Sequence, residues 1–166
     1  MIYLIADTHF GEDAIRRYEN RPFTTAREMD EALIRNWNAV VKDGDLVYVL
    51  GDFSSAGRER EVLEKLSGRK ILVKGNHDTA SCREYREWGF EEAYDLPVIL
   101  DGFWILSHEP LYVNENMPYA NLFGHVHASP QYRTYSTQHY CVSAERIGYV
   151  PIALEEVKDK IRNYTK

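Results

Sequence analysis

The chain has 166 residues, of which 44% are hydrophobic and 13% aromatic, so it can bury the core of one domain, and general disorder is excluded. Its formal net charge is −6 with no block of Lys and Arg, which argues against a protein that follows a long nucleic acid by neutralising phosphates. No run of about 18 apolar residues occurs, so no membrane span is expected.

The apolar stretch at the N-terminus does not have the features of a secretory leader. It runs from Met1 to Ala6, has no basic segment or small-residue cleavage site, and is ended by Asp7. The two cysteines, Cys82 and Cys141, have no CxxC spacing. We therefore expect reduced thiols and a cytoplasmic protein.

Strand-like and helix-like segments alternate in the first half of the chain. In order, the pattern predicts a strand over 2–6, a helix over 25–42, a strand over 46–50, a helix over 57–66 and a strand over 71–73. The first helix has the strongest signal, because Thr25 and Glu28 match a capping box and Met29, Leu33 and Trp37 recur at helical spacing.

The second half of the chain is mostly strands and turns. Strands are predicted over 97–100, 103–106, 121–123 and 140–142, and a helix over 154–163. This order of elements predicts one layered α/β domain over residues 1–166, without a linker.

Polar motifs follow five of the predicted strands and contain five of the six histidines. They are Asp7-Thr8-His9, Gly51-Asp52, Gly75-Asn76-His77-Asp78, Ser107-His108 and Gly124-His125-Val126-His127. Because ligands usually bind outside the carboxyl ends of strands in an open α/β sheet, we expect these segments to converge. Side chains two apart on an extended chain point the same way, so Asp7 and His9 can reach one ion and His125 and His127 can share a face. The glycines leave the backbone free to turn sharply.

These residue types suit a pair of borderline divalent cations, because they combine carboxylates, an amide oxygen and imidazoles. Two cations about 3.5 to 4 Å apart repel each other, and a shared anionic oxygen relieves that repulsion. Asp52, which follows a strand and a glycine, is the best candidate for this bridge. The motifs therefore predict a dinuclear hydrolytic site.

The order D-x-H, GD, GNHD, H and GHxH resembles the calcineurin-like metallophosphoesterases, from Asp7 to His127. The resemblance implies a four-layer αββα sandwich of two mixed β-sheets flanked by helices. It also implies two metal ions and a bridging residue. One ion would take Asp7, His9 and His127, the other Asn76, His108 and His125, and Asp52 would bridge them.

The resemblance further implies attack of a metal-bound hydroxide on a small phosphoester substrate. His77 would protonate the leaving oxygen, and Asp78 would orient that ring or stabilise its charge. We expect Mn²⁺ in both sites, although Fe, Ni, Zn, Co or Mg also suits these ligands. The sequence leaves the oligomeric state open.

One motif departs from the larger protein phosphatases of this family. Theirs resembles GDxVDRG, whereas this chain has Gly51-Asp52-Phe53-Ser54-Ser55, so the Arg that grips phosphate is missing. A dianionic monoester depends on such a guanidinium more than a monoanionic diester does, which favours a phosphodiesterase over a phosphatase. Arg21, Lys74 or Arg146 could replace the missing group. The segment Arg21-Pro22-Phe23 resembles a small bacterial and phage subgroup of phosphoesterases.

Other interpretations remain open. A non-catalytic scaffold of the same fold, a nuclease, and a zinc hydrolase acting on C–N or lactone bonds are the functional alternatives. His139 matches no motif and is expected to be structural or exposed. The tyrosines at 112, 119, 132 and 135 could stack on a nucleobase, but packing at a strand edge explains them better.

Overall fold

The computed structural model describes residues 1–55 and 57–164. Within them, the helices are α1 (Asp13–Tyr18), α2 (Ala26–Val40), α3 (Glu59–Leu63), α4 (Cys82–Trp88), α5 (Leu154–Arg162) and the short 3-10 helix η1 (Ala144–Ile147). The strands are β1 (Ile2–Ile5), β2 (Leu46–Val49), β3 (Arg69–Val73), β4 (Glu92–Tyr94), β5 (Val98–Leu100), β6 (Trp104–Leu106), β7 (Ala120–Phe123), β8 (His139–Cys141) and β9 (Ile152–Ala153).

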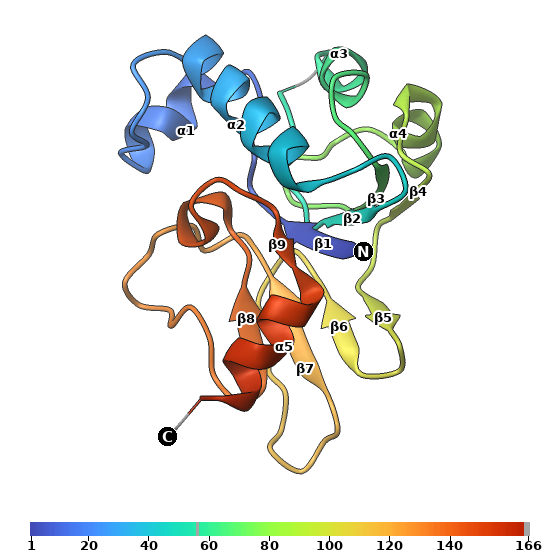
Figure 1. The fold of residues 1–166 in the computed structure, drawn as a ribbon, viewed down its shortest axis with the longest axis vertical. Coiled ribbons are helices and arrows are strands. Elements are labelled where there is room, and N and C mark those ends of the chain that lie inside the picture. Colours follow the sequence, from blue (N-terminus) through green and yellow to red (C-terminus); the bar gives the residue numbers. More distant parts are fainter. Residues whose placement is uncertain (56, 165–166) are drawn as a thin grey trace.

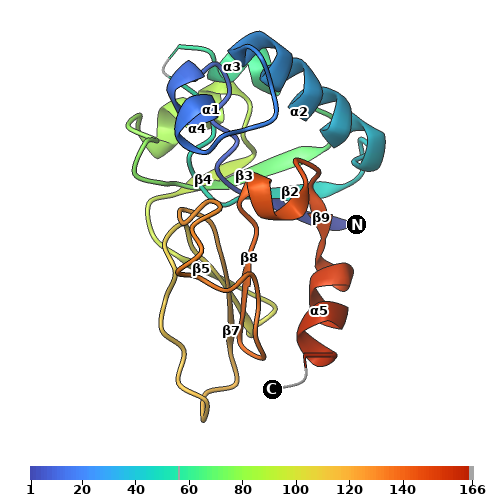
Figure 2. The same ribbon diagram turned by 90° about the vertical axis from the view of Figure 1, so that its left-hand side faces the viewer.

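These strands form two mixed sheets. The first has the order β4-β3-β2-β1-β9, in which only β9 is antiparallel to its neighbour, and the second has the order β5-β6-β7-β8, in which only β5 is antiparallel. Helices α1 to α4 cover the outer side of the first sheet, and α5 lies beside the second sheet (Figures 1 and 2). The prediction of two mixed sheets flanked by helices in one α/β domain is confirmed.

Two apolar cores hold these layers together. Met29, Leu33 and Trp37 of α2 pack on Val47 and Val49 of β2, which forms the core between the helices and the first sheet. The second core lies between the sheets, and α5 adds its own buried side chains to it. Its members include Leu4, Leu50, Val73, Leu106, Leu122, Tyr140, Val157 and Ile161. Burial of each layer on both sides fixes the register of the strands, because a slip of one residue would expose the apolar face.

The end of β1 joins the two sheets. The Ala6 N–H donates to the Val142 carbonyl at 2.9 Å, and the Ala6 carbonyl accepts from the Ala144 N–H at 3.0 Å. On its other side, the Asp7 N–H donates to the Gly51 carbonyl at 3.0 Å. The carboxyl ends of strands from both sheets therefore meet around Asp7.

Most of the predicted elements are present, with local differences. Thr25 caps α2 by accepting the Glu28 N–H at 3.1 Å, but Glu28 accepts from the Thr24 N–H at 2.7 Å, one residue before the capping-box position. The helix predicted over 57–66 is shorter, spanning Glu59–Leu63. Elements α1, α4, β4 and β9 were not predicted.

Two further observations concern the predictions on thiols and membranes. Both described cysteines, Cys82 and Cys141, are free, and Cys141 is buried. None of the described helices is both long and apolar enough to cross a membrane.

Candidate metal centre

The five polar segments converge at the junction of the two sheets. One group of donor atoms comes from Asp7, His9 and His127, and another from Asp7, Asp52 and His108, with the atoms of each group lying within 4.8 Å of one another. Asp7 and His9 are buried, and the rings of His9 and His127 stack with their centroids 5.3 Å apart. Two loops more than 100 residues apart in sequence thus place an aspartate and two imidazoles around one point.

A second cluster lies beside the first. The side-chain oxygen of Asn76 lies 3.0 Å from His108 Nε2 and 3.0 Å from His125 Nδ1, and these two nitrogens are 3.1 Å apart. Three lone-pair donors from three loops therefore point toward one another. This convergence suits a shared cation.

Asp52 lies between the two clusters. Its Oδ2 atom is 3.5 Å from His9 Nε2 and 3.4 Å from His108 Nε2. Its other oxygen accepts the His77 backbone N–H at 2.9 Å. One carboxylate thus faces a nitrogen of each cluster, which is the arrangement required of a bridging ligand.

Five residues of this centre have left-handed backbone conformations. Their φ angles are 57° at Asp7, 48° at His9, 53° at Asp52, 68° at His125 and 45° at His127. Few residues other than glycine adopt positive φ, although Asp and His tolerate it better than most. Such conformations persist only where the surrounding structure imposes them, and they concentrate at functional sites.

The neighbouring glycines allow the loops to approach one another closely. A Cβ atom at Gly75 would lie 2.3 Å from Asp52 Oδ1, and one at Gly124 would lie 2.7 Å from Asp7 Oδ2. Of the three motif glycines, Gly51, Gly75 and Gly124, it is Gly51 that has a positive φ, of +84°. Sharp turning, which the sequence suggested for all three, therefore applies to Gly51, whereas close packing explains the other two.

The histidines are oriented by oxygen atoms outside the centre. His9 Nδ1 lies 2.7 Å from Glu12 Oε2, His108 Nδ1 lies 2.9 Å from the Leu50 carbonyl, and His127 Nδ1 lies 3.1 Å from Glu145 Oε1. For the metal-binding form we assign a single proton to Nδ1 of each ring, which leaves Nε2 with a free lone pair. Metal-binding histidines are commonly held in this way.

The Nε2 atom of His9 tests whether the residues fit a metal ion. It is buried and has no hydrogen-bond partner among the described residues. A buried polar atom without a partner is unusual and requires a physical explanation. A cation supplies one, because the same nitrogen faces Asp52 and the His9 ring stacks on the ring of His127. The donor set of imidazole, carboxylate and amide oxygen thus fits a borderline divalent metal.

The charges in the centre are coupled. Burial opposes ionisation of Asp52, but the hydrogen bond from His108 and the His77 N–H outweigh burial and lower the pKa of Asp52 to about 2. Burial likewise disfavours the charged form of His108, but Asp52 and Asp7 outweigh it and raise the pKa of His108 to about 9. Burial raises the pKa of Asp7. In the metal-free protein, both ring nitrogens of His108 are therefore protonated at neutral pH, and Nε2 must lose its proton before it can bind an ion.

His77 and Asp78 occupy different environments. His77 is exposed, and its ring lies 5.1 Å from the His9 ring in an edge-on arrangement. Asp78 is buried, and its carboxylate accepts the backbone N–H groups of Asp52 and Gly75, both at 2.8 Å. No hydrogen bond joins the Asp78 carboxylate to the His77 ring within the described part of the chain. Asp78 thus ties two loops of the centre together.

The three basic residues considered for phosphate binding also differ. The Arg21 side chain is completely buried and donates to Glu145 and to the Asp7 carbonyl, both at 2.6 Å. Arg146 donates to the carbonyls of His127, Ser129 and Tyr132. Lys74 pairs with Asp95 at 2.7 Å and lines a cleft of about 300 Å³ together with Asn76 and His108. Lys74 is therefore the one of the three that borders the cleft at the centre.

Sequence reasoning missed two carboxylates. Glu12 lies three residues after His9, so its position in the same turn is a signal that could have been noticed. Glu145 contacts His127 and also Arg21, which is 124 residues away in sequence. No local pattern reveals that contact.

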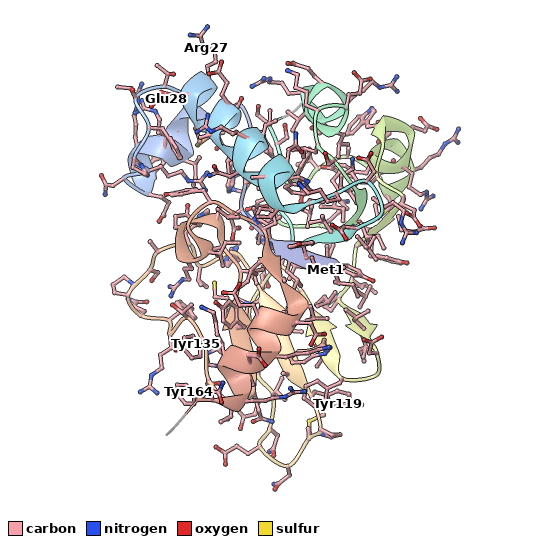
Figure 3. The ribbon with its side chains drawn as sticks, viewed as in Figure 1. Met1, Arg27, Glu28, Tyr119, Tyr135 and Tyr164 are labelled. Carbon is pink, nitrogen blue, oxygen red and sulfur yellow. The ribbon has the colours of Figure 1, made fainter. Side chains whose placement is uncertain are left out.

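Tyr135 packs against other rings, whereas Tyr112 and Tyr132 are more exposed to solvent. Tyr135 stacks on Tyr140 with ring centroids 5.6 Å apart and also contacts Tyr164, beside the second sheet (Figure 3). Tyr112 is 90% exposed, and Tyr132 is 44% exposed. Packing explains Tyr135 but does not explain Tyr112.

Comparison with protein families gives one match over most of the chain. A family model described as calcineurin-like phosphoesterase matches residues 1–159. An uncharacterized protein of Methanocaldococcus jannaschii is 36% identical over 168 residues, which covers 93% of this chain and 87% of that protein. The Gene 66 protein of Mycobacterium phage L5 is 31% identical over 81 residues, 46% of this chain and 39% of that protein.

Two solved structures are similar in fold. A protein of unknown function from Aquifex aeolicus superposes with a TM-score of 0.72 at 29% identity, covering 96% of this chain and 98% of that chain. The nuclease MPE of Pseudomonas putida superposes with a TM-score of 0.54 at 22% identity, covering 76% of this chain and 61% of that chain. The second likeness concerns the fold alone.

Proposed function

Because the chain belongs to the calcineurin-like phosphoesterase family, we propose that it hydrolyses phosphoesters at a centre of two divalent metal ions. The position of Asp52 between the two donor clusters is the observation that carries this proposal. Asp7, His9 and His127 would hold one ion, Asn76, His108 and His125 the other, and Asp52 would contact both. Mn²⁺ is the metal we favour.

When bound, two such ions supply Lewis acidity toward the phosphoryl oxygens and an activated water as nucleophile. The protein's part is to fix the donor atoms before substrate arrives. Asp52 stays ionised at neutral pH because its pKa is about 2, so it can neutralise part of the charge of both ions. Glu145 and the Leu50 carbonyl keep the rings of His127 and His108 turned toward the centre.

His77 is our candidate for the general acid. Its backbone is fixed by the N–H bond to Asp52, and its ring is exposed at the edge of the centre next to His9. An imidazole in that position can donate a proton to the leaving oxygen of a bound ester. We assign Asp78 a positioning role, because its carboxylate holds the loops that carry Asp52 and His77.

A phosphodiester is the favoured substrate class. Arg21 and Arg146 are committed to carbonyl and carboxylate oxygens of the protein, so neither guanidinium is free to grip the extra charge of a monoester. Lys74 offers a single ammonium that already pairs with Asp95. A monoanionic diester carries one negative charge less than a dianionic monoester, so it needs fewer positively charged side chains in order to bind.

A nucleotide-bearing diester is a second, narrower candidate. Tyr112, Tyr132 and Arg133 border a groove of about 410 Å³, and Leu111 borders both this groove and the cleft at Asn76 and His108. An exposed aromatic ring next to an arginine can stack on a base. The fold shared with a nuclease is compatible with this substrate. Replacement of Tyr112 by Ala should raise KM for a nucleotide p-nitrophenyl ester about 10-fold, within the usual range for one stacked base, and leave KM for methyl p-nitrophenyl phosphate unchanged.

The test of the main proposal uses metal-stripped protein. Hydrolysis of an aryl phosphodiester and of the matching monoester would be measured after adding Mn²⁺, Ni²⁺ or Zn²⁺. We expect turnover to return with metal, faster for the diester, and Asp52→Asn to lose metal and activity together. Tight binding of two ions without hydrolysis of either ester would favour the scaffold alternative instead.

A further inference from the structure

Glu12 lies in a tight turn that begins at His9. Its backbone N–H donates to the His9 carbonyl at 3.1 Å, and Gly11 between them has a φ of +81°. The Gly11 N–H donates to buried Asp30 of α2 at 2.8 Å, and Asp30 pairs with Arg58 at 2.6 Å. The turn is therefore anchored from outside the metal centre, which fixes where the Glu12 side chain begins.

The Glu12 carboxylate contacts the ring of His9. The distance of 2.7 Å from Glu12 Oε2 to His9 Nδ1 is that of a strong hydrogen bond, with Nδ1 donating. The opposite nitrogen, Nε2, faces Asp52 and has no hydrogen-bond partner among the residues described. Glu12 thus selects the form of His9 in which the bare nitrogen points at the predicted ion.

The same carboxylate also faces the predicted general acid. One donor atom each of His9, Glu12 and His77 lie within 4.8 Å of one another. The Glu12 side chain is 26% exposed, so it reaches the open edge of the centre where His77 lies. Asp78, to which the sequence assigned the support of His77, directs its oxygens to backbone N–H groups instead.

We propose that Glu12 is a positioning residue that orients His9 toward one ion and holds the His77 ring over the leaving group. This inference rests on the proposed function, because it assigns Glu12 to the same centre. It is independent of the identity of the substrate.

The experiment compares Glu12→Ala and Glu12→Gln with wild type. Asp13→Ala is the matched control, because Asp13 is the next residue and, among the residues that the structure describes, forms ion pairs with Arg16 and Arg17 of its own helix and none with the centre. Calorimetric titration of metal-stripped protein with Mn²⁺ should show one of the two ions binding about 10- to 100-fold more weakly in Glu12→Ala. Glu12→Gln should restore most of that affinity, because its amide oxygen can still accept from His9 Nδ1.

The second measurement separates the two roles at saturating Mn²⁺. Turnover of a p-nitrophenyl diester, whose leaving group needs no proton, should change little in Glu12→Ala. Turnover of an alkyl diester, which needs the proton from His77, should fall about 10-fold or more. Asp13→Ala should match wild type in both assays.

Three results would overturn the inference. The first is wild-type Mn²⁺ affinity in Glu12→Ala, and the second is an unchanged ratio of the two turnover rates. The third is a third bound ion in wild type that both Glu12 variants lose, since Glu12 would then be a ligand. Failure of wild type itself to bind two ions or to cleave either ester would instead contradict the proposed function. The affinity of Glu12→Ala still tests Glu12 when neither ester is cleaved.

Discussion

The ring of His77 lies at the exposed edge of the centre, outside the two clusters of donor atoms. Its loss should therefore leave both ions bound. For an ester with a poor leaving group, His77→Ala is expected to lower turnover by a factor on the order of 10² to 10⁴, the usual range for a general acid. Steady-state kinetics with an alkyl diester and a metal analysis of the variant check this.

His139→Ala is the matched control for that experiment. His139 Nδ1 lies 2.7 Å from Ser136 Oγ, and His139 belongs to none of the donor clusters found among the described residues. Unchanged turnover of the alkyl diester in His77→Ala would remove His77 from the chemistry.

His108 gives a prediction about pH. Its pKa of about 9 in the metal-free protein lies above the ordinary value of 6.5, so the ring is protonated at pH 7 and must lose that proton to bind an ion. Metal affinity should then rise with pH up to about 9 and fall as the pH is lowered. Titration calorimetry at pH 7 in two buffers of different ionisation enthalpy would detect the released proton. Equal heats in both buffers would show that His108 is already neutral.

At the scale of the elements, the loops after β2 and β3 are packed too tightly to accept a side chain at Gly75. Its Cβ would lie 2.3 Å from Asp52 Oδ1 and 2.8 Å from His108 Cε1. Gly75→Ala should displace both residues, weaken metal binding at least about 10-fold and destabilise the fold by about 1–3 kcal/mol. Thermal unfolding and metal titration would measure these effects.

Gly44→Ala, in the turn before β2 and away from the centre, is the control, because no atom of the described residues lies within 4 Å of its added Cβ. Its free energy of unfolding should change by no more than about 0.5 kcal/mol. If Gly75→Ala binds metal as well as Gly44→Ala and wild type do, the loops can move apart far enough to relieve the 2.3 Å contact without consequence for the metal ligands.

The elements that the sequence predicted well are those with a strong local pattern. Helix α2 combines a cap residue, Thr25, with repeated apolar positions over 15 residues. Helix α1 has six residues, none of them buried, so its sequence has no apolar periodicity to detect. Helix α4 begins with a full capping box at Ser81 and Glu84, and this Ser-x-x-Glu spacing is the one local signal for that helix in the sequence.

The candidate site shows the same difference between what a local sequence pattern reveals and what it does not. Asp7, Asp52 and His108 follow β1, β2 and β6, and the fold brings their side chains together; their role as metal ligands stays a prediction. The environment of Asp78 depends on backbone N–H groups of a loop 26 residues earlier, and that of Glu145 depends on Arg21. Contacts of this kind follow from the packing of distant segments, so sequence spacing does not reveal them.

At the scale of the whole molecule, each donor cluster takes ligands from both sheets. Asp7 and His9 follow β1 of the first sheet whereas His127 follows β7 of the second, and Asn76 follows β3 whereas His108 follows β6. Bound ions would therefore connect the two layers. Free metal at 100 times its dissociation constant stabilises a protein by about 2.7 kcal/mol per site.

We accordingly expect removal of both ions to lower Tm by roughly 10–20 °C, since the stabilisation is lost at two sites and each kcal/mol corresponds to about 2–4 °C in a chain of this size. Scanning calorimetry of wild type and Asp52→Asn, each with and without Mn²⁺, would measure the difference. The variant should show little response to metal. A wild-type Tm that is independent of metal would mean that the centre forms no link between the sheets.

The left-handed residues of the centre affect how the protein could change under selection for stability. Glycine adopts positive φ without strain, so Asp7, His9, Asp52, His125 and His127 each hold a conformation that a glycine would favour more. Replacing any of them would relax the backbone and remove a donor atom at the same time. Selection for heat resistance of the metal-free protein should therefore favour glycine at His9, His125 or His127 at the expense of metal binding, but not at Asp7 or Asp52, whose carboxylates accept the His125 and His77 N–H groups.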